Sequence, residues 1–485
     1  MIKTTPVIRP VEKWVMRFLL CFAGIALAIP TPAARPNIVF FITDDHGLLD
    51  SSVYGSKDVS TPNMRKLADR GVTFTNAFVA SPSCAPSRAA LITGLMPARN
   101  GAEANHSRPR PEIRKWPAYF QELGYEVVAF GKVTHYQHTA DYGFDHFAHD
   151  RFHDQAAIPA AIKFLETHDP NATRPLCLMV GSNWPHVPWP KEFSTHDPET
   201  LTLPAGSIDT SKTREWRAQY LAAVDKADED FGRIYETAQS KLGKDAITLF
   251  SSDHGAQWPF GKWNLYDAGI RVPLIVEWSG VVKRGTKSDA TVSWIDILPT
   301  LLEAAGGQPP PDIDGQSFLP VLRGEKTSHR DRIFTTHTGD ERWNIYPMRS
   351  VRTAEWKYIM NLHPEFAFTT HIDLPGELGQ RDFWSTWESA AKTDKFAAAI
   401  VNGYHQRPAD ELYELTADPH EQHNLASHPN QEMRIEEMRS ELRTWMRSQD
   451  DKTTVPAKPR LLSDPSSYGP GAAALGTSVS KIKGR

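Results

Sequence analysis

Continuous apolar runs that alternate with helical patterns constrain the fold of this 485-residue chain most. The run at 37–43 is apolar at every position from 38 to 42, which is typical of a strand covered on both faces. Similar runs follow at 125–130, 176–180, 246–251 and 272–277. Helical patterns lie between them, such as the stripe Tyr220, Val224, Ala227, Phe231 and Ile234. This alternation predicts an α/β fold whose mostly parallel sheet is sandwiched by helices.

The sequence changes in character at about residue 333. Shorter strand-like pieces appear there, and a helical pattern runs from about 431 to 448. We therefore expect a first domain over 36–332 and a smaller C-terminal α+β domain with an antiparallel sheet over 333–451. The segment 452–485 is rich in Pro, Ser, Gly and Ala, so we predict a flexible tail.

The N-terminus has the pattern of an export signal. Four basic residues precede the apolar run 18–29, which is too short to span a bilayer as a stable anchor. Ala26-Leu27-Ala28 supplies a small-x-small cleavage site. We predict a signal peptide over 1–28 and an exported protein, periplasmic or secreted; an uncleaved anchor is the alternative.

Composition excludes some classes of function. The chain is 40% hydrophobic and 23% charged, which is typical of a soluble globular protein. Its formal net charge of −4 provides no broad basic field, so we expect no nucleic-acid partner.

The three cysteines have different surroundings. Cys21 lies inside the predicted signal, and Cys177 lies in an apolar run where a buried structural thiol is expected. Cys84 lies among Ser, Pro, Ala and Arg, which is not a core environment. An exported chain with this few cysteines is no disulfide scaffold, and Cys84 needs another explanation.

Polar residues follow four of the predicted strands directly or within a few positions. They are Asp44-Asp45, Gly131-Lys132, His186 and Asp253-His254. Each alone is typical of a turn, a helix cap or a solvated side chain. In a parallel sheet, however, all of them project from the carboxyl edge, where open α/β folds bind ligands. The pattern predicts a site at that edge.

Asp44, Asp45 and Asp253 would place three carboxylates in this site. Oxygen-rich sites suit Ca²⁺ or Mg²⁺, and we take Ca²⁺ as the first candidate. Zinc is an alternative because histidines cluster at 135, 138, 146, 149 and 153. Their spacing does not form a standard zinc motif.

Cys84-Ala85-Pro86-Ser87-Arg88 precedes a helix-forming run over 89–93 that ends at Gly94. Cys84 is therefore predicted at or just before a helix N-terminus, where backbone N–H groups and the helix dipole favour an anion. By itself this arrangement fits a thiolate nucleophile of low pKa.

Cys-x-Pro-Ser-Arg, continued by Ala89, Leu91, Thr93 and Gly94, closely resembles the signature of the sulfatase family. With Asp-Asp before it and Lys and Asp-His-Gly after it, the resemblance runs from about 36 to about 450. It implies an alkaline-phosphatase-like core, a hydrolase of sulfate esters or sulfamates, and a cysteine oxidised to formylglycine before export. A formylglycine-generating enzyme or its equivalent would then act on the chain during maturation.

The resemblance also assigns roles to residues. It implies five ligands for one divalent metal ion: Asp44, Asp45, Cys84, Asp253 and His254. Arg88 would hold the formylglycine diol and the charge at the metal. Lys132 and Lys262 match two sulfate-binding lysines, with Tyr266 four residues after Lys262.

Two histidines complete the implied catalytic set. His186 matches the residue that protonates the leaving group. The commonest family pattern has a histidine two residues after the first lysine, but Thr134 stands there and His135 follows. An iduronate-sulfatase-like branch shares this longer spacing, so we assign His135 as the base, with His138 as the alternative.

The C-terminal part carries a narrower resemblance, to heparan N-sulfatase. It rests on Tyr346-Pro347-Met348-Arg349-Ser350-Val351 and on 411–425. It implies a sulfated saccharide substrate, with the N-sulfoglucosamine end of heparan as first candidate and an O-sulfate of an algal or other polysaccharide as alternative. His106, His337 and Arg349 are candidate sugar-binding residues. Both histidines are more often surface or core residues, and Arg349 could equally belong to a core strand.

Two other classes of function remain open from the residues. Related folds hydrolyse phosphate or phosphonate esters at the same metal-binding edge. A sugar-binding protein without catalysis is the other alternative, if Cys84 stays a thiol.

Overall fold

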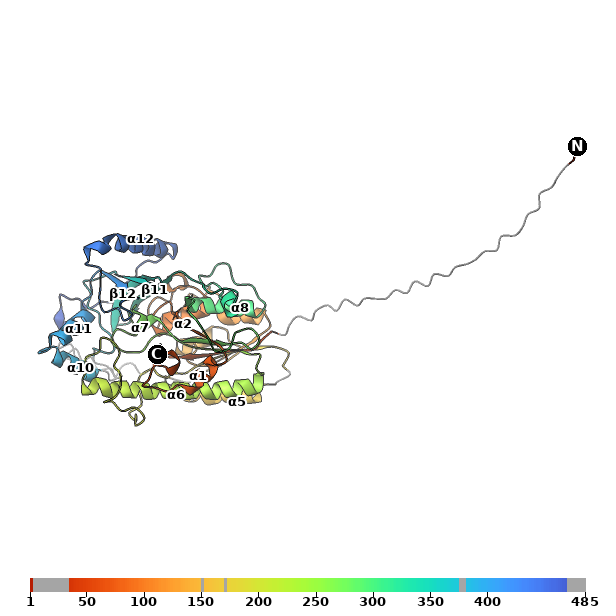
Figure 1. Cartoon of the computed structure of the whole chain (residues 1–485), viewed down its shortest axis with the longest axis horizontal. Helices are drawn as coiled ribbons and strands as arrows, with labels where there is room; N and C mark the ends of the chain where they lie inside the picture. Colours follow the sequence, from red (N-terminus) through yellow and green to blue (C-terminus); the bar gives the residue numbers. More distant parts are fainter. Residues whose placement is uncertain (3–34, 150–151, 170–171, 375–380, 469–485) are drawn as a thin grey trace. The chain divides into compact units, whose positions relative to one another are not determined.

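The computed structural model describes residues 1–2, 35–149, 152–169, 172–374 and 381–468 (Figure 1). Nearly all of the predicted signal peptide and the end of the predicted tail, 469–485, lie outside the described residues. Everything below concerns the part of the chain from residue 36 onward.

A mostly parallel eight-stranded sheet, sheet A, lies at the centre of this part of the chain. Its strand order is β5-β4-β6-β1-β7-β8-β2-β9. In that order the strands are His146–Ala148, Glu126–Gly131, Leu176–Gly181, Ile38–Thr43, Ile247–Ser252, Leu274–Glu277, Val72–Phe74 and Thr286–Ser288. Ile38 of the central strand pairs with Cys177 on one side and Ile247 on the other, both in parallel register.

Strand β8 is the exception to the parallel arrangement. It runs antiparallel to both β7 and β2. Between β7 and β8 the described helix is only the short α7 (Asp267–Ile270), not a crossover helix that would carry the chain back to the other end of the sheet. The apolar run at 272–277 is therefore a strand as predicted, but of opposite direction.

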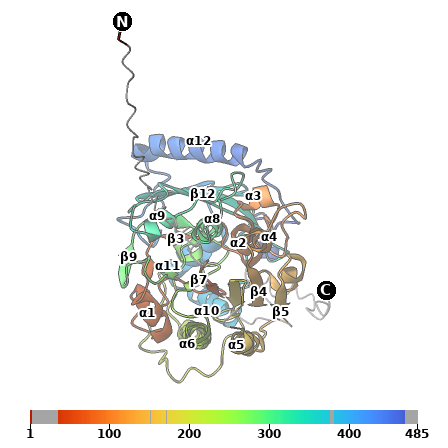
Figure 2. The ribbon, with the colours of Figure 1, turned by 90° about the vertical axis from the view of Figure 1, so that its right-hand side faces the viewer.

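Helices cover both faces of sheet A, because alternate side chains of each strand point to opposite sides. Val39 and Phe41 pack on α1, α5 and α6, whereas Phe40 and Ile42 face α2, α4 and α8 (Figure 2). The first three helices are Pro62–Ala68, Ala157–Thr167 and Ser211–Leu242; the other three are Cys84–Thr93, Trp116–Glu122 and Ile297–Ala304. The predicted sheet sandwiched by helices is confirmed.

A second sheet, sheet C, is antiparallel and contains strands β11-β12-β13-β14 in that order. They are Ile333–Asp340, Asn344–Arg352, Trp356–Asn361 and Asp410–Glu414. One face, with Tyr346, Met348 and Ile359, joins the core beside sheet A, and the other packs on α12 (Glu432–Ser448). The predicted smaller antiparallel sheet is confirmed, while the exact domain boundaries stay predictions.

Shorter elements complete the described part of the chain. The helices are α3 (Pro97–Asn100), α9 (Leu319–Leu322), α10 (Arg381–Ala390) and α11 (Lys395–His405), and β3 (Ala77–Phe78) pairs with β10 (Val292–Ser293). Short 3₁₀ turns lie at Ser52–Tyr54, Tyr136–Asp141, Trp294–Asp296, Pro429–Gln431 and Pro465–Ser467. Within the predicted tail, the backbone N–H of Leu462 donates to the carbonyl of Glu365, so this stretch is tied to the fold.

Buried ion pairs join sheet C to α7. Lys357 of β13 lies 2.6 Å from Asp267 and 2.6 Å from Glu421, and Arg352 of β12 forms two bonds of 2.9 Å to Asp267. Burial alone would raise the pKa of Asp267, but Lys357 and Arg352 hold it well below its usual value. Asp267 therefore remains ionised, and the pairs fix sheet C beside the carboxyl edge of sheet A.

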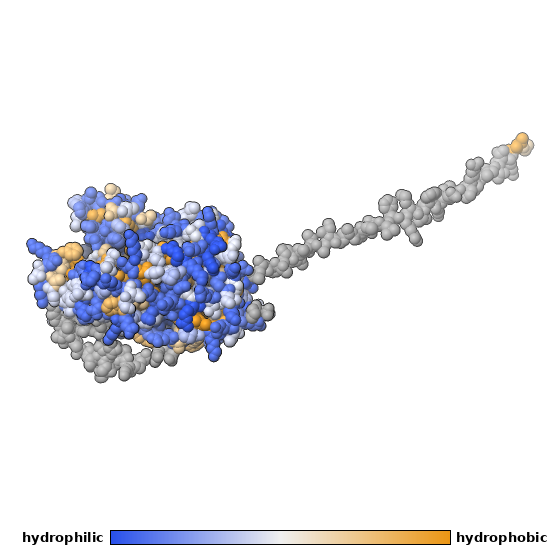
Figure 3. Space-filling view, turned by 60° about the horizontal axis from the view of Figure 1, so that its bottom comes forward, coloured by the Kyte–Doolittle hydropathy of each residue, from blue (hydrophilic) through white to orange (hydrophobic). Residues whose placement is uncertain are grey.

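The face shown in Figure 3 is mostly hydrophilic, with its apolar residues in small separate patches. Among the described residues, no helix combines the length and apolar character needed to cross a membrane.

Replacing Lys357 with Met should lower the free energy of unfolding by about 3–5 kcal/mol, because it leaves the charges of Asp267 and Glu421 buried without their shared cation. Equilibrium unfolding in urea measures this change. Lys66→Met is the matched control, since the Lys66–Glu236 pair is exposed and should be worth about 0–1 kcal/mol. Equal losses in both variants would contradict a structural role for the buried pairs.

Candidate active site

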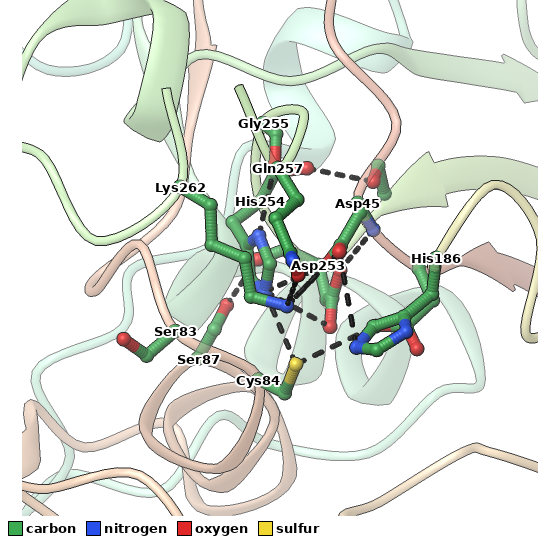
Figure 4. Close-up of polar contacts among 12 residues, drawn as sticks. Asp45, Ser83, Cys84, Ser87, His186, Asp253, His254, Gly255, Gln257 and Lys262 are labelled. Atoms are coloured by element: carbon green, nitrogen blue, oxygen red, sulfur yellow. Dashed lines mark hydrogen bonds and ion pairs between the residues drawn. The ribbon is translucent and has the colours of Figure 1, made fainter. Parts of the chain in front are cut away.

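The carboxyl edge of sheet A gathers the polar residues that follow its strands (Figure 4). Asp44 and Asp45 follow β1, Lys132 follows β4, and Asp253 follows β7. Cys84 enters from the N-terminus of α2. Residues far apart in the sequence thus share one buried cluster, which is the juxtaposition that their strand-end positions predict.

Cys84 is held at the first position of α2. Ser83 precedes it in an extended conformation, and Gly94 ends the helix with a left-handed φ of 67°. The N–H of Ala85 donates to Oδ1 of Asn105 at 3.0 Å, which fixes the first turn. The residue-84 side chain therefore lies where the helix dipole favours negative charge.

Two glycines allow Lys132 to reach the site. Gly131 ends β4 with φ of 71°, and a Cβ there would lie 2.1 Å from the carbonyl oxygen of Gly181. A Cβ on Gly181 would likewise lie 2.1 Å from the carbonyl oxygen of Lys132. Larger residues would push β4 and β6 apart at the point where Lys132 turns toward Asp44.

Four donor atoms could hold a metal ion. One atom each of Asp44, Cys84, Asp253 and His254 lies within 4.8 Å of the others, and all four residues are buried. Nδ1 of His254 lies 3.0 Å from the carbonyl oxygen of Gly255, which accepts its proton, so Nε2 keeps a free lone pair. That Nε2 lies 3.3 Å from Cys84 Sγ and 3.5 Å from Asp253. Two of these four donor atoms are carboxylate oxygens, and the carboxylate of Asp45 adds a third oxygen donor beside His254, which fits a hard divalent cation.

Asp45 lies beside the same donors, with Oδ1 at 3.4 Å from Nε2 of His254. Asp45, Cys84 and His186 form a second group of close donor atoms. Asp45 adopts a left-handed φ of 68°, which is uncommon for a residue other than glycine, and its N–H donates to Asp253 Oδ1 at 3.1 Å. The unusual backbone aligns its carboxylate with Lys262 rather than with solvent.

Each buried carboxylate of the cluster has a cationic partner. Lys132 Nζ lies 2.5 Å from Asp44, and Lys262 Nζ lies 2.9 Å from both oxygens of Asp45.

Arg88 supplies the third pair: its Nε donates to Asp253 at 2.9 Å. The cluster therefore contains three carboxyl groups and three cationic partners. A bound divalent cation would make the cluster positive, and an anionic ligand could then restore neutrality.

Burial shifts the ionisation of these carboxyl groups in different directions. It opposes ionisation of Asp44, yet the charges of Lys132 and Arg88 hold the pKa of Asp44 well below its usual range. For Asp45, burial outweighs Lys262, and the nearby Asp44 and Asp253 add to it, which raises its pKa to about 7. A bound cation would relieve the repulsion among these carboxylates, which is strong in a site shielded from water.

The Cys84 side chain itself is only 2% exposed. Burial raises the pKa of its thiol, and the lowering effect of Lys132 and Lys262 does not compensate. The thiolate nucleophile suggested by the helix N-terminus is therefore not favoured, because the thiol keeps its proton in this environment.

His186 lies beside Asp45, with Nε2 at 3.9 Å from Asp45 Oδ2. Its Nδ1 lies 2.6 Å from the carbonyl oxygen of Val187, so Nδ1 carries a proton and Nε2 faces the acidic cluster. Burial, reinforced by Lys262, lowers the pKa of His186 well below its usual value.

His135 lies at the edge of the cluster. Its Nε2 is 2.7 Å from Nδ1 of His106, and among the described residues no hydrogen bond joins it to Cys84. The rings of His135 and His138 lie 5.3 Å apart. The choice between these two histidines as base stays a prediction.

The three candidate sugar-binding residues lie in different environments. His106 is part-exposed beside His135. His337 is buried and contacts Ser83 at 3.3 Å and Asn344 at 2.7 Å. Arg349 is buried and pairs with Asp451 at 2.5 Å. These contacts support the start of α2 and the strands of sheet C, so sugar binding by His337 and Arg349 gains no support and stays a prediction.

Several residues around the site were not identified from the sequence. Tyr136 OH lies 3.2 Å from Lys132 Nζ, and Gln257 Oε1 accepts from Lys262 at 3.3 Å. Asp340, at the end of β11, contacts Asn105 and His106. Asp340 follows no strand of sheet A. Tyr136 and Gln257 do lie five residues after β4 and β7, but neither is a charged residue or a common metal ligand, so the strand-end pattern did not single them out.

Known proteins resemble this chain along most of its length. The sequence model of a family described as sulfatase matches residues 36–307, and a model described as N-sulphoglucosamine sulphohydrolase, C-terminal, matches 254–375. An ulvan-active sulfatase from Formosa agariphila is 31% identical over 429 residues, covering 86% of this chain and 81% of that protein. The N-sulphoglucosamine sulphohydrolase of Homo sapiens is 28% identical over 463 residues, covering 85% and 90%.

Solved structures share the fold. One, described as a complex with its substrate D-glucosamine-2-N,6-O-disulfate, superposes with a TM-score of 0.65 at 21% identity. The match covers 87% of this chain and 100% of that one.

Titration calorimetry should detect one Ca²⁺ or Mg²⁺ per chain, because the two groups of donors share Cys84 and Asp45 lies 3.4 Å from His254, so together they surround one position. At a free concentration 100 times the dissociation constant, the ion should stabilise the fold by about 2.7 kcal/mol. Asp253→Asn should weaken binding roughly 10-fold or more, whereas Asp141→Asn, in an exposed pair with Arg108, should not. Equal binding by both variants would contradict this site.

Proposed function

This chain belongs to the sulfatase family, and we propose that it hydrolyses sulfate from a sulfated saccharide, using residue 84 after oxidation of Cys84 to formylglycine. The observation that carries the proposal is the burial of Cys84 among paired carboxylates and cations at the carboxyl edge of sheet A. The chain is thus a hydrolase of sulfate esters or sulfamates, and the bond and the sugar are the parts that we propose.

Asp44, Asp45, Asp253 and His254, together with residue 84, would hold one divalent cation, with Ca²⁺ as first candidate and Mg²⁺ as second. When bound, the cation supplies positive charge that offsets the charge of sulfate as the transition state forms. Formylglycine, as its hydrate, supplies two hydroxyl groups, one for attack on sulfur and one that can lose a proton. No ordinary serine or cysteine offers that second hydroxyl.

Lys132 and Lys262 supply the remaining charge. Both lie beside residue 84 and are buried, and their present partners are carboxylates that a cation would engage instead. Freed in this way, the two ammonium groups can bind sulfate oxygens. Arg88, fixed by Asp253 and by the carbonyl of Val133 at 3.2 Å, holds positive charge beneath residue 84. Charge placed in advance in a dry site costs no reorganisation during the reaction.

Two histidines handle protons. His186 presents Nε2 to the site. Burial lowers its pKa, so the negative charge of a bound sulfate would have to favour the imidazolium form that protonates the leaving oxygen or nitrogen. His135 would take the proton from the second hydroxyl, which releases sulfate and restores the aldehyde. A positioned acid or base typically contributes about 10²–10⁴ in rate.

The identity of the sulfated sugar is the more specific part of the proposal. The match of 254–375 to N-sulphoglucosamine sulphohydrolase and the 28% identity to the human protein support N-sulfoglucosamine at the end of heparan. The 31% identity to an ulvan-active sulfatase supports the alternative, an O-sulfate of an algal polysaccharide. A formylglycine-generating enzyme would act before export to the periplasm or medium, for which the N-terminal pattern 1–28 argues.

Mass spectrometry of the peptide that contains residue 84 should find the aldehyde in active protein. A panel of N- and O-sulfated saccharides should release free sulfate with the native protein. Cys84→Ala should abolish this release, while Cys177→Ala, which changes the other mature cysteine, should retain it. His186→Ala should lower turnover by about 10²–10⁴.

Two outcomes would contradict the proposal. An unmodified thiol in all of the native protein, with binding but no turnover of sulfated sugars, would indicate a sugar-binding protein. Turnover of phosphate or phosphonate esters that persists in Cys84→Ser, without sulfate release by the native protein, would indicate a phosphohydrolase.

A further inference from the structure

We propose that Tyr136 contacts the substrate, and that its hydroxyl donates a hydrogen bond to an oxygen of the sulfate group beside Lys132. The inference rests on the proposed function, in which sulfate binds next to residue 84. It adds a donor to which neither the strand-end pattern nor the family resemblance assigned a role.

Tyr136 lies directly beside one of the two lysines proposed to bind sulfate. It begins the 3₁₀ turn Tyr136–Asp141, and its hydroxyl oxygen is 3.2 Å from Nζ of Lys132. The same Nζ lies 3.5 Å from Sγ of Cys84 and 4.5 Å from the centre of the Tyr136 ring. One ammonium group therefore contacts both residue 84 and the phenol, so an anion that it binds at residue 84 has the phenol as a neighbour.

The direction of the bond to Lys132 leaves the phenol proton available. A lysine ammonium has three donor hydrogens and no acceptor, so the oxygen of Tyr136 must accept. The hydroxyl hydrogen then points elsewhere, and among the described residues no hydrogen bond takes it up. Burial raises the pKa of the Tyr136 phenol, so the group keeps its proton at neutral pH. The site thus contains a donor that a ligand can use.

Lys132 and Tyr136 become a pair of donors when Asp44 is engaged elsewhere. Nζ of Lys132 lies 2.5 Å from Asp44, one of the residues proposed to hold the cation. With Asp44 engaged by the cation, the ammonium keeps its contact with the phenol and has a hydrogen left for a new acceptor. Sulfate offers several anionic oxygens, and hydrogen bonds to an anion are shorter and roughly twice as strong as neutral ones. We therefore expect sulfate to accept from both residues.

The backbone holds Tyr136 in a conformation that a bulky side chain rarely adopts. Its φ is 52°, in the left-handed region that favours glycine. Asp45 and Trp263, which follows Lys262, share this region with φ of 68° and 66°. Such conformations cost free energy, persist where surrounding contacts hold them, and are common at functional sites. At Tyr136 the conformation brings the phenol to Lys132.

Aromatic neighbours hold the ring of Tyr136. The rings of Phe152 and His149 lie 5.7 Å and 5.8 Å away, both edge to face. Phe152 is 42% exposed and also meets the ring of His186 edge to face, at 5.4 Å. A single aromatic ring therefore separates Tyr136 from the proposed acid, so Tyr136 is tied to the site at two points.

A crystal structure of the native protein with Ca²⁺ and inorganic sulfate tests the contact directly. We expect a sulfate oxygen at about 2.5–2.8 Å from the hydroxyl oxygen of Tyr136, with Lys132 bound to the same anion. A sulfate held at residue 84 with all of its oxygens more than about 3.5 Å from that hydroxyl would overturn the proposal.

Tyr136→Phe removes the hydroxyl and keeps the ring. In titration calorimetry with inorganic sulfate, the Ca²⁺-saturated variant should bind roughly 10- to 100-fold more weakly than the native protein, because a hydrogen bond to a charged group is of this order. Its kcat/KM for a sulfated saccharide should fall by a similar factor. Tyr119→Phe is the matched control and should change neither, since Arg114 lies 4.2 Å over the ring of Tyr119 on α4, outside the site.

The outcomes separate this inference from the proposed function. A native protein that binds sulfate beside Tyr136 but releases none from any sulfated saccharide would defeat the proposed function and leave the contact standing. An active native protein whose Tyr136→Phe variant keeps full sulfate affinity would defeat the contact alone. Weaker binding in Tyr136→Phe without a contact in the crystal would also overturn it, because Tyr136 would then only position Lys132. A native protein that neither binds nor releases sulfate would defeat both.

Discussion

The pairing of three buried carboxylates with three buried cations is the interaction on which this site depends. Asp44, Asp45 and Asp253 would be costly to ionise in a dry environment without Lys132, Lys262 and Arg88. The pairing stabilises these buried charges in the folded protein when no ligand is bound. In the proposed function, a cation would bind the carboxylates and an anion would bind the ammonium groups that are freed.

The backbone of the fold places these charged side chains close enough to pair. Parallel strands deliver their ends to one edge, and glycines at 131 and 181 let two of those ends approach closely enough for Lys132 to reach Asp44. Sheet C is held against the same edge by the buried ion pairs of Asp267. Through Asp340 at the end of β11, that second sheet also contacts the histidines beside the site.

Much of the architecture was readable from local pattern. Apolar runs at 37–43, 125–130, 176–180 and 246–251 became parallel strands, because side chains covered on both faces have no polar alternation. The direction of β8 could not be predicted, because an apolar run does not indicate whether the strand will run parallel or antiparallel to its neighbours. The place of Asp44, Asp45, Lys132 and Asp253 at one edge followed from their positions directly after strands.

The sequence by itself thus determined the sheet, the start of α2 at Cys84, and the family and the class of reaction, because strand ends and short motifs are local features. Only the tertiary structure decided which charges pair, that the Cys84 thiol keeps its proton, and that Asp340 reaches His106. Those properties depend on burial and on contacts between residues far apart in the chain; Asp340 ends β11, whereas His106 lies in the loop between α3 and α4. Ionisation and proton position are set by such surroundings, which no local pattern encodes.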